Sequence, residues 1–241
     1  MRHGRVVLII QARMGSTRLP GKSMMPLAGK PLIEQLLLRV KRTKMVEGIV
    51  LATTRTSQDD VLCEVARKND VETFRGAESD LVDRYYQAAV HFGANFIVRL
   101  PGDNPVAEPG EIDRIIQHYL HSDDDFSANT HNILGNGYPD GLGAEVFSTE
   151  SITQIWKTVS DPRNREHPHT NYYEHPEKYK IGTVKCPKEF RRPDLKLDVN
   201  TQEEYEFLAD LYSYLYPRNP NFNITEIIQW YDLIYKPSRK E

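Results

Sequence analysis

Cysteine is scarce in this chain of 241 residues: only Cys63 and Cys186 are present, and they lie far apart. Two distant cysteines form neither a disulfide framework nor a zinc site, and they indicate packed thiols in a reducing, cytoplasmic compartment. No apolar run approaches the ~18 residues that a membrane span requires. The start, MRHGRVVLII, leads into QARMGSTR rather than a signal-peptide cleavage site. We therefore expect a cytoplasmic protein with no membrane partner.

An excess of charge of either sign is also lacking. The chain has 31 Lys and Arg residues and 34 Asp and Glu residues, so its formal net charge is −3. Proteins that bind nucleic acid usually carry a basic excess, so nucleic acid is not the expected partner. The sequence contains no nucleophile elbow or Ser-His-Asp arrangement. His167 and His169 form a His-x-His pair, but no carboxylate or cysteine spacing supports a zinc site there.

Strand and helix patterns alternate through the first half of the chain. Apolar runs at residues 6–10, 48–53, 71–74 and 96–100 predict buried strands. Between them, PLIEQLLLRVKR, DDVLCEVARKN and SDLVDRYYQAAVHF have the apolar spacing of helices, the second opened by acids. This order predicts an α/β fold with a mostly parallel central sheet and helices on both of its faces.

The second half has a less regular pattern. It predicts strands at residues 125–130, 144–148, 179–186 and 195–200, and helices at 111–121, 151–159, 201–216 and 223–234. Asn223 and Glu226 have the spacing of a capping box. The polar segment RNREHPHTNYYEHPEKY has no assignable pattern. Because no linker or internal repeat is present, we predict one domain over residues 1–241.

A glycine-containing loop follows the first predicted strand and approximates a nucleotide-binding P-loop. Five residues separate Gly15 from Gly21-Lys22-Ser23, one more than in a P-loop, and Pro26 stands where the P-loop helix would begin. A P-loop kinase or ATPase is therefore disfavoured. The loop is about twenty residues long and follows a buried strand, which favours function over an ordinary solvated basic loop.

Cations and hydroxyls gather in this loop. Arg13, Ser16, Arg18 and Lys22 lie within ten residues. Arginine offers a planar fork to phosphate oxygens, lysine offers a point charge, and glycine lets backbone N–H groups approach. We expect the loop to surround a polyphosphate.

Acidic residues lie at a second strand end. Asp103 in LPGDNP is either a Mg²⁺ ligand or an ordinary turn residue. In LKLDVN, Asp198 and Asn200 are two apart, so on a strand both would point to one face and could complete a metal site with Asp103. Alternatively, Asn200 or Thr201 caps the following helix. Ligands of parallel sheets bind at the carboxyl ends of strands, so the basic loop and Asp103 are expected to face one another.

These motifs resemble a known family. IIQARMGSTRLPGKSMMPLAGKPLIE is similar to the signature of the sugar-acid cytidylyltransferases, which include the 3-deoxy-manno-octulosonate and N-acetylneuraminate enzymes. The blocks RGAESDLVDRYYQAA, VRLPGDNP, YPDGLGAEVFS, REHPHTNYY and LDVNTQEEYEFL resemble the spore-coat polysaccharide cytidylyltransferase-like branch, in its order. The resemblance implies a Rossmann-like nucleotide-diphospho-sugar transferase fold. It also implies Mg²⁺-dependent transfer of CMP from CTP to a sugar or sugar acid, with release of pyrophosphate, for surface polysaccharide biosynthesis.

The resemblance also implies roles for residues that match its motifs. Lys22, Arg13 and Asp103 would be catalytic. The nucleotide would contact Ala12, Arg13, Gly15, Ser16, Arg18, Lys22, Thr53 and Asp103, and Mg²⁺ would contact Asp103, Asp198 and Asn200. The acceptor would contact Asp140, Glu145, Arg165 and His167. Residues 1–105 would form the nucleotide-binding half and residues 106–241 the acceptor-binding and dimerisation half of a homodimer.

The chain departs from the family pattern at two positions. Asn200 replaces an expected carboxylate, and Gly143 stands where an aspartate is expected. These departures leave open a relative that binds nucleotide without turnover. A second alternative keeps the fold but changes the substrates: a sugar-1-phosphate nucleotidyltransferase that uses another NTP.

Overall fold

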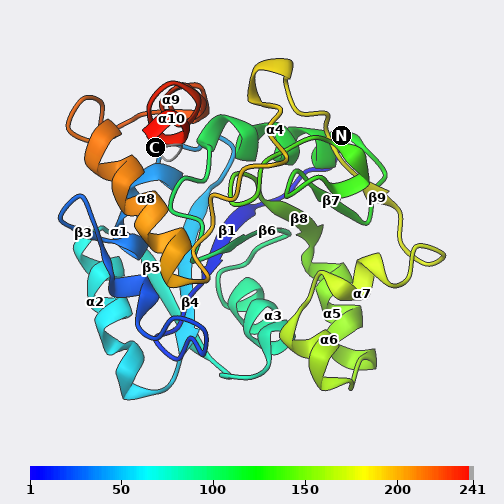
Figure 1. Ribbon diagram of the computed structural model, residues 1–241. Coiled ribbons are helices and arrows are strands. Elements are labelled where there is room, and N and C mark those ends of the chain that lie inside the picture. Colours follow the sequence, from blue (N-terminus) through cyan, green and yellow to red (C-terminus); the bar gives the residue numbers. More distant parts are fainter. Residues whose placement is uncertain (239–241) are drawn as a thin grey trace.

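A seven-stranded sheet forms the centre of the computed structural model, which describes residues 1–238 (Figure 1). In spatial order its strands are β5 (Glu72–Gly76), β4 (Gly48–Thr54), β1 (Val6–Gln11), β6 (Phe96–Pro101), β8 (Glu145–Ser148), β7 (Phe126–Ala128) and β9 (Ile181–Gly182). β8 is antiparallel to both of its neighbours, and every other pairing is parallel. The prediction of a mostly parallel sheet is confirmed.

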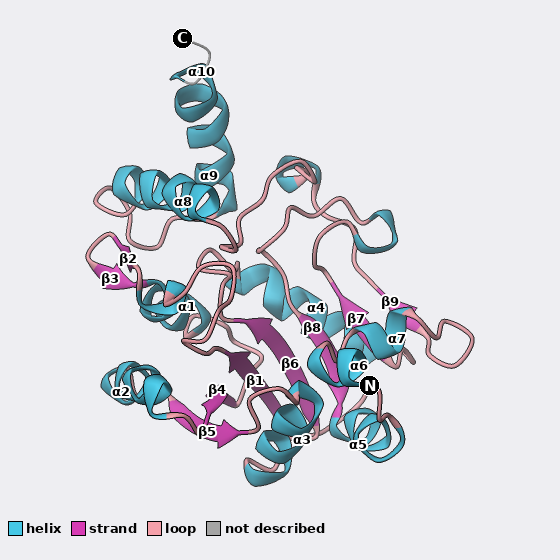
Figure 2. Cartoon of the chain, turned by 60° about the horizontal axis from the view of Figure 1, so that its bottom comes forward, coloured by secondary structure: helices cyan, strands magenta, loops and turns pink. Residues whose placement is uncertain are grey.

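Helices cover both faces of this sheet, as predicted (Figure 2). Residues alternate between faces along a strand, so Val6, Leu8 and Ile10 pack with one set of helices and Val7 and Ile9 with the other. The first set is α1 (Leu32–Val40), α2 (Asp60–Lys68) and α4 (Pro109–His121), and the second is α3 (Leu81–His91) and α5 (Thr149–Thr158). Each fully buried aliphatic side chain contributes roughly 1.5–3 kcal/mol.

A separate apolar cluster holds the carboxyl-terminal helices in place. It joins α8 (Gln202–Leu215) and α9 (Ile224–Trp230) to the small hairpin of β2 (Pro26–Leu27) and β3 (Lys30–Pro31). Both helices begin with capping boxes, the predicted one at Asn223 and another at Thr201. This cluster fixes the segment just before α8, which contains Asp198 and Asn200, beside the basic loop.

The remaining elements are short. They are α6 (Pro162–Glu166), α7 (Thr170–Tyr173), α10 (Lys236–Ser238), the π-helix η5 (Tyr231–Tyr235), and single 3-10 turns η1 (Lys22–Met24), η2 (Ser57–Asp59), η3 (Ile133–Gly135) and η4 (Lys188–Phe190). α6 and α7 lie in the segment for which the sequence had no assignable pattern.

One predicted strand is much shorter than expected, and another is wrong. Residues 179–186 form only the two-residue strand β9, and residues 195–200 form no strand beyond an isolated bridge between Asp140 and Lys196. The backbone here bonds to two loops instead: Leu197 N donates to Asp140 O (3.2 Å), and Val199 N donates to Asp103 O (2.9 Å). Side chains still alternate, so Asp198 and Asn200 share a face, as predicted.

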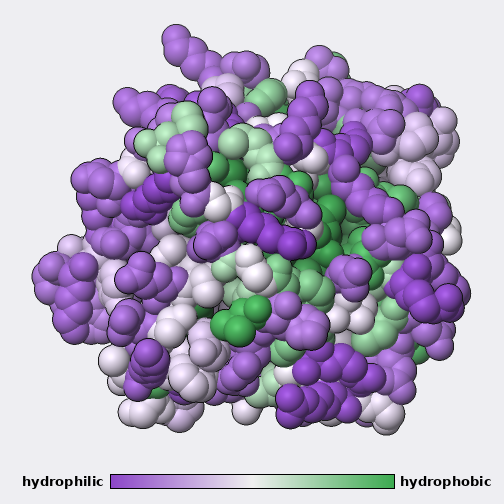
Figure 3. All heavy atoms as spheres, turned by 180° about the vertical axis from the view of Figure 1, so that it is seen from behind, coloured by the Kyte–Doolittle hydropathy of each residue, from purple (hydrophilic) through white to green (hydrophobic). Residues whose placement is uncertain are grey.

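The cysteines, both in the described part of the chain, form no disulfide, and the surface seen from behind is mostly polar. Cys63 and Cys186 are both free; Cys186 is buried and Cys63 is half-buried, where packed thiols were expected. Figure 3 shows mostly hydrophilic side chains over the rear face, with small hydrophobic areas between them. No helix within residues 1–238 has the length and apolar content to cross a membrane.

Candidate active site

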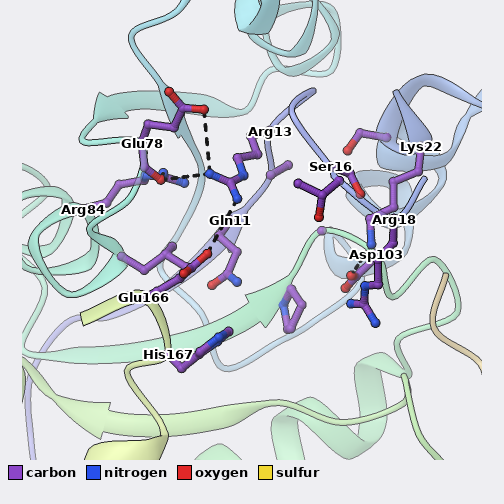
Figure 4. A pocket seen from close by; sticks show the side chains of 16 residues that line it. Gln11, Arg13, Ser16, Arg18, Lys22, Glu78, Arg84, Asp103, Glu166 and His167 are labelled. Carbon is purple, nitrogen blue, oxygen red and sulfur yellow. Dashed lines mark hydrogen bonds and ion pairs between the residues drawn. The ribbon is translucent and has the colours of Figure 1, made fainter. Parts of the chain in front are cut away.

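A cavity of about 250 Å³ lies at the carboxyl ends of β1 and β6 (Figure 4). Such strand ends are where parallel sheets bind ligands. The cavity is lined by residues of the basic loop, of the 101–103 turn, of α3 with the loop before it, and of α6 with the residue after it: Gln11, Ala12, Arg13, Ser16, Thr17, Arg18, Lys22, Ser23, Glu78, Leu81, Arg84, Pro101, Gly102, Asp103, Glu166 and His167.

The basic loop does not have the conformation of a P-loop. Ser16 N and Gly21 N both donate to Met14 O, at 2.9 and 3.2 Å, and Gly21 has a left-handed φ of 72° that suits glycine. Only the short turn η1 follows, and then the β2–β3 hairpin, so no helix begins at Lys22. The sequence-based rejection of a P-loop is confirmed. Gly15 is exposed and does not line the cavity.

Lys22 joins two distant parts of the chain. Its Nζ lies 2.6 Å from Asp103 Oδ2, 2.6 Å from Val199 O and 3.2 Å from Asn200 Oδ1. These contacts use all three donors of the ammonium group. The Lys22 side chain is only 12% exposed, so the pair with Asp103 is more strongly held than an ordinary surface ion pair. The predicted meeting of the basic loop with the acidic segments is therefore present.

Asn200 connects the basic loop to Asp198. Its Oδ1 accepts from Arg18 Nη2 at 2.5 Å, and its Nδ2 donates to Asp198 Oδ2. A carboxylate at position 200 could not donate to Asp198 and would repel it. The amide therefore allows the polar segment to remain intact when no cation is bound.

Asp198 is the residue whose surroundings best fit a bound cation. Its Oδ1 is buried and has no hydrogen-bond partner. Burial, followed by repulsion from the Asp140 and Asp103 carboxylates, raises the pKa of Asp198 to about 6. Mg²⁺ in phosphate-binding sites needs only one or two protein carboxylates, because phosphates and water complete its shell. No cluster of three or more metal-binding side chains occurs in residues 1–238, but Asp103 and Asp198 fit this smaller requirement.

Asp59 holds the basic loop in place through a buried hydrogen-bond network. Its carboxylate is 1% exposed and accepts from Met14 N (2.8 Å), Thr53 Oγ1 (2.8 Å), Thr54 N (3.0 Å) and Thr54 Oγ1 (2.5 Å). Thr53 is fully buried by this network and does not line the cavity. Its expected contact with nucleotide is therefore wrong, because its hydroxyl supports the loop through Asp59.

Arg13 lies among carboxylates at the other end of the cavity. Its guanidinium is 3.8 Å from Glu78 Oε1 and 3.7 Å from Glu166 Oε1, and it donates to Glu78 O at 3.3 Å. The nearby Arg84 is buried, and it donates to the backbone carbonyls of Ala77 and Glu78 at 2.6–2.8 Å. Neither arginine at this end is therefore free of protein partners.

A second cavity, of about 340 Å³, contains two of the predicted acceptor contacts. Asp140 and Glu145 line it with Thr130, His131, Ile133, His169 and Tyr173. Burial lowers the pKa of His169, which favours its neutral form, and its Nδ1 is buried without a partner. The His169 ring lies 5.9 Å from that of His167, which lines the first cavity. A histidine pair therefore connects the two cavities.

Arg165 lies elsewhere, and its expected acceptor contact is wrong. Its Nε is 2.6 Å from Asp80 Oδ2, and its Nη1 donates to Trp156 O and Val159 O. These bonds tie α6 to the start of α3 and the end of α5, so Arg165 has a structural role. Gly143 also has a packing explanation, because a Cβ there would lie 2.1 Å from Asn129 O.

Several residues that line or support the cavity carried no recognised sequence signal. Asp59 reads as an ordinary acid at a helix start, and Glu78 and Glu166 as solvated charges. Gln11 had the clearest available signal, because it is a polar residue directly after five buried apolar ones. Of the residues assigned to the nucleotide, Ala12, Arg13, Ser16, Arg18, Lys22 and Asp103 all line the cavity.

Comparison with known proteins agrees with this geometry. The family described as Cytidylyltransferase matches residues 7–226. The Bacillus subtilis (strain 168) spore coat polysaccharide biosynthesis protein SpsF is 32% identical over 228 residues, which cover 92% of each chain. A solved cytidylyltransferase structure from Leptospira borgpetersenii serovar Hardjo-bovis (strain JB197) has a TM-score of 0.88 at 32% identity, over 98% of this chain and 96% of that chain. A CMP:2-keto-3-deoxy-manno-octonic acid synthetase complexed with CTP shares the fold, with a TM-score of 0.63 at 16% identity, over 87% of this chain and 98% of that chain.

Proposed function

The chain belongs to the cytidylyltransferase family, and we propose that it transfers CMP from CTP to a sugar or sugar acid, with release of pyrophosphate, for surface polysaccharide biosynthesis. The observation that carries the proposal is the contact of Lys22, which lines the first cavity, with Asp103 and Asn200. This contact supports the proposal because it joins the basic loop to the two segments that carry Asp103 and Asp198.

The proposed reaction is a displacement at the α-phosphorus of CTP. The acceptor hydroxyl loses its proton to water and its oxygen forms the new P–O bond. The bond from the α-phosphorus to the oxygen that bridges to the β-phosphate breaks, and pyrophosphate leaves with that electron pair. The protein contributes alignment and charge neutralisation more than covalent chemistry. Lys22 and Arg18 lie where they can offset the charge that develops on the leaving pyrophosphate. For Lys22 this requires the ammonium to exchange part of its contact with Asp103 for phosphate oxygens.

We propose Mg²⁺ as the cofactor, held by Asp103 and Asp198 with Asn200 beside them. The unpartnered Asp198 oxygen and its raised pKa support this assignment. When bound, the ion would supply positive charge to the phosphates and lower the pKa of the acceptor hydroxyl. Asn200 would retain its bond to Arg18 and so hold the basic loop beside Asp103 and Asp198.

The second cavity is the proposed acceptor site. It offers the carboxylates of Asp140 and Glu145, which can accept hydrogen bonds from sugar hydroxyls. His167 lines the first cavity and its ring neighbours that of His169 in the second, so it would lie between nucleotide and acceptor. We retain homodimer formation as a prediction, which light scattering of the purified protein checks directly.

Pyrophosphate release tests the proposal. The protein is incubated with CTP, UTP, ATP or GTP, in Mg²⁺ or in EDTA, with a panel of sugar acids, sugars and sugar 1-phosphates. We expect release with CTP and a sugar or sugar acid only when Mg²⁺ is present. Release with a sugar 1-phosphate and another NTP would support the related nucleotidyltransferase instead. Tight CTP binding without release on any acceptor would indicate a binding protein.

A further inference from the structure

The two ends of the first cavity differ in the charge they offer to a ligand. Figure 4 shows Ser16, Arg18, Lys22 and Asp103 at one end, Glu78, Arg84, Glu166 and His167 at the other, and Gln11 between them. Lys22 and Arg18 supply the positive charge at the first end. At the second end Arg13 is already paired with two carboxylates. A nucleotide has the same asymmetry: with its phosphates beside Lys22, its base extends toward Gln11 and the second end.

The Gln11 side chain is held in one orientation by a buried network. Its Oε1 accepts from Tyr85 OH at 2.5 Å and from Arg99 Nε at 3.2 Å. Arginine can only donate, so the atom facing Arg99 must be the amide oxygen and cannot be the nitrogen. Arg99 is in turn held by Glu145 at 2.7 Å, and the side chains of this pair are 5% and 7% exposed. The amide therefore cannot flip without leaving buried donors unpaired, which is costly.

Because the amide orientation is fixed, Gln11 can offer a ligand only the N–H donors of its Nε2. Gln11 Nε2 makes no hydrogen bond to other residues in the described chain, and Gln11 lines the cavity. Cytosine presents an unprotonated N3 on its pairing edge, whereas uracil presents N3–H at the same place. A freely rotating glutamine could satisfy either base, but one that can only donate favours cytosine.

We infer that Gln11 is the residue that selects cytosine over uracil, by donating from Nε2 to N3 of the base, with Tyr85 and Arg99 as the positioning residues that prevent the amide from flipping. This inference rests on the proposed use of CTP. It adds a base-reading residue that the sequence motifs did not indicate, because the motifs contained no residue assigned to the base.

Binding of CTP and UTP to the purified protein tests this inference without any acceptor. Dissociation constants are measured by calorimetry in Mg²⁺ for wild type and for Gln11→Glu. The substitution keeps an oxygen toward Tyr85 and Arg99 but replaces the Nε2 donor by an acceptor, which suits uracil N3–H. The added negative charge weakens both nucleotides alike, so the readout is the ratio of the two constants. We expect preference for CTP over UTP to fall by about 10-fold or more.

Two further variants complete the experiment. Gln11→Met removes the donor without adding charge, and it should also reduce the preference, so the test survives if Gln11→Glu does not fold. Gln154→Glu, on the exposed side of α5, is the matched control and should leave the preference unchanged. An unchanged ratio in both Gln11 variants, or equal affinity of wild type for CTP and UTP, overturns the inference. Wild type that binds neither nucleotide would instead refute the proposed function itself.

Discussion

Replacing Asp59 by asparagine isolates what one buried carboxylate contributes to the loop that forms the cavity. The carboxylate accepts four hydrogen bonds, from Met14 N, Thr53 Oγ1, Thr54 N and Thr54 Oγ1. Asparagine has the same shape but only one acceptor oxygen, and its NH₂ group would face donors. Asp59→Asn therefore removes interactions without creating a cavity.

The expected magnitude follows from these four bonds. Hydrogen bonds to charged groups contribute about 1.5–3 kcal/mol each, and leaving a buried partner unpaired adds its desolvation cost. Asparagine keeps the hydrogen bonds to one oxygen and loses one or two to the other. The free energy of unfolding should therefore fall by about 2–4 kcal/mol. For a chain of this size that corresponds to a fall in Tm of roughly 4–16 °C. CTP binding should weaken as well, because Met14 is part of the basic loop.

The pH dependence gives a second, independent signature. Burial acts to raise the pKa of Asp59, but hydrogen bonds from Thr54, Met14 and Thr53 outweigh it, so the pKa lies below the ordinary value of 3.8. Because the folded state favours the charged form, its stabilisation is complete above that ordinary value and is lost as pH falls through the lower folded pKa. The difference in the free energy of unfolding between wild type and Asp59→Asn should therefore be constant at neutral pH and should decrease below pH 3.8.

Denaturant unfolding followed by circular dichroism at several pH values measures both effects. Asp60→Asn is the matched control, since Asp60 is the next residue, its side chain is exposed, and its partner among residues 1–238 is the half-buried Arg75. That control should change stability by less than about 1 kcal/mol. The reasoning is refuted if Asp59→Asn at neutral pH is no less stable than Asp60→Asn, or if the difference from wild type increases in acid.

The other predictions concern the cavity itself. Lys22→Ala and Asp103→Asn should each lower the rate of pyrophosphate release by ~10²–10³ while circular dichroism shows an intact fold. Near-normal turnover by either variant would show that the residue has no role in the reaction. Glu166→Gln removes a negative charge from the lining of the cavity, so the CTP anion should bind a few-fold more tightly (about 2–5-fold). Looser binding would show that Glu166 itself contacts the nucleotide. Asn200→Asp adds a third carboxylate to Asp103 and Asp198 at the proposed metal site. Its Tm should fall in EDTA and rise more with added Mg²⁺ than wild type does, and an equal Mg²⁺ response in both proteins would argue against a cation there.

Much of the fold was predictable because its signals are local. The continuous apolar run at residues 6–10 indicated a strand buried on both faces, and this strand is the centre of the sheet. Capping at Asn223 followed from a three-residue spacing. The rejection of a P-loop needed only a residue count and Pro26. The composition of the basic loop likewise predicted that it surrounds a polyphosphate, because arginine, lysine and glycine suit phosphate in any fold.

The errors arose where a segment's partners are distant. Residues 195–200 have the alternation of a strand, yet their backbone bonds to loops around Asp103 and Asp140 rather than to a neighbouring strand. Thr53 and Arg165 carry suitable chemistry, but Asp59 and Asp80 engage their donors away from any ligand. No local pattern reports such partners, because they depend on how the sheet orders its strands.

The amino-acid sequence by itself therefore determined which side chains are available for chemistry and which elements carry them. Periodicity and composition act over a few residues, and these can be read directly. Only the tertiary structure decided which donors remain free for a ligand. The locked amide of Gln11 and the unpartnered oxygen of Asp198 both arise from contacts across more than fifty residues of chain, since burial and pairing are properties of the assembled sheet.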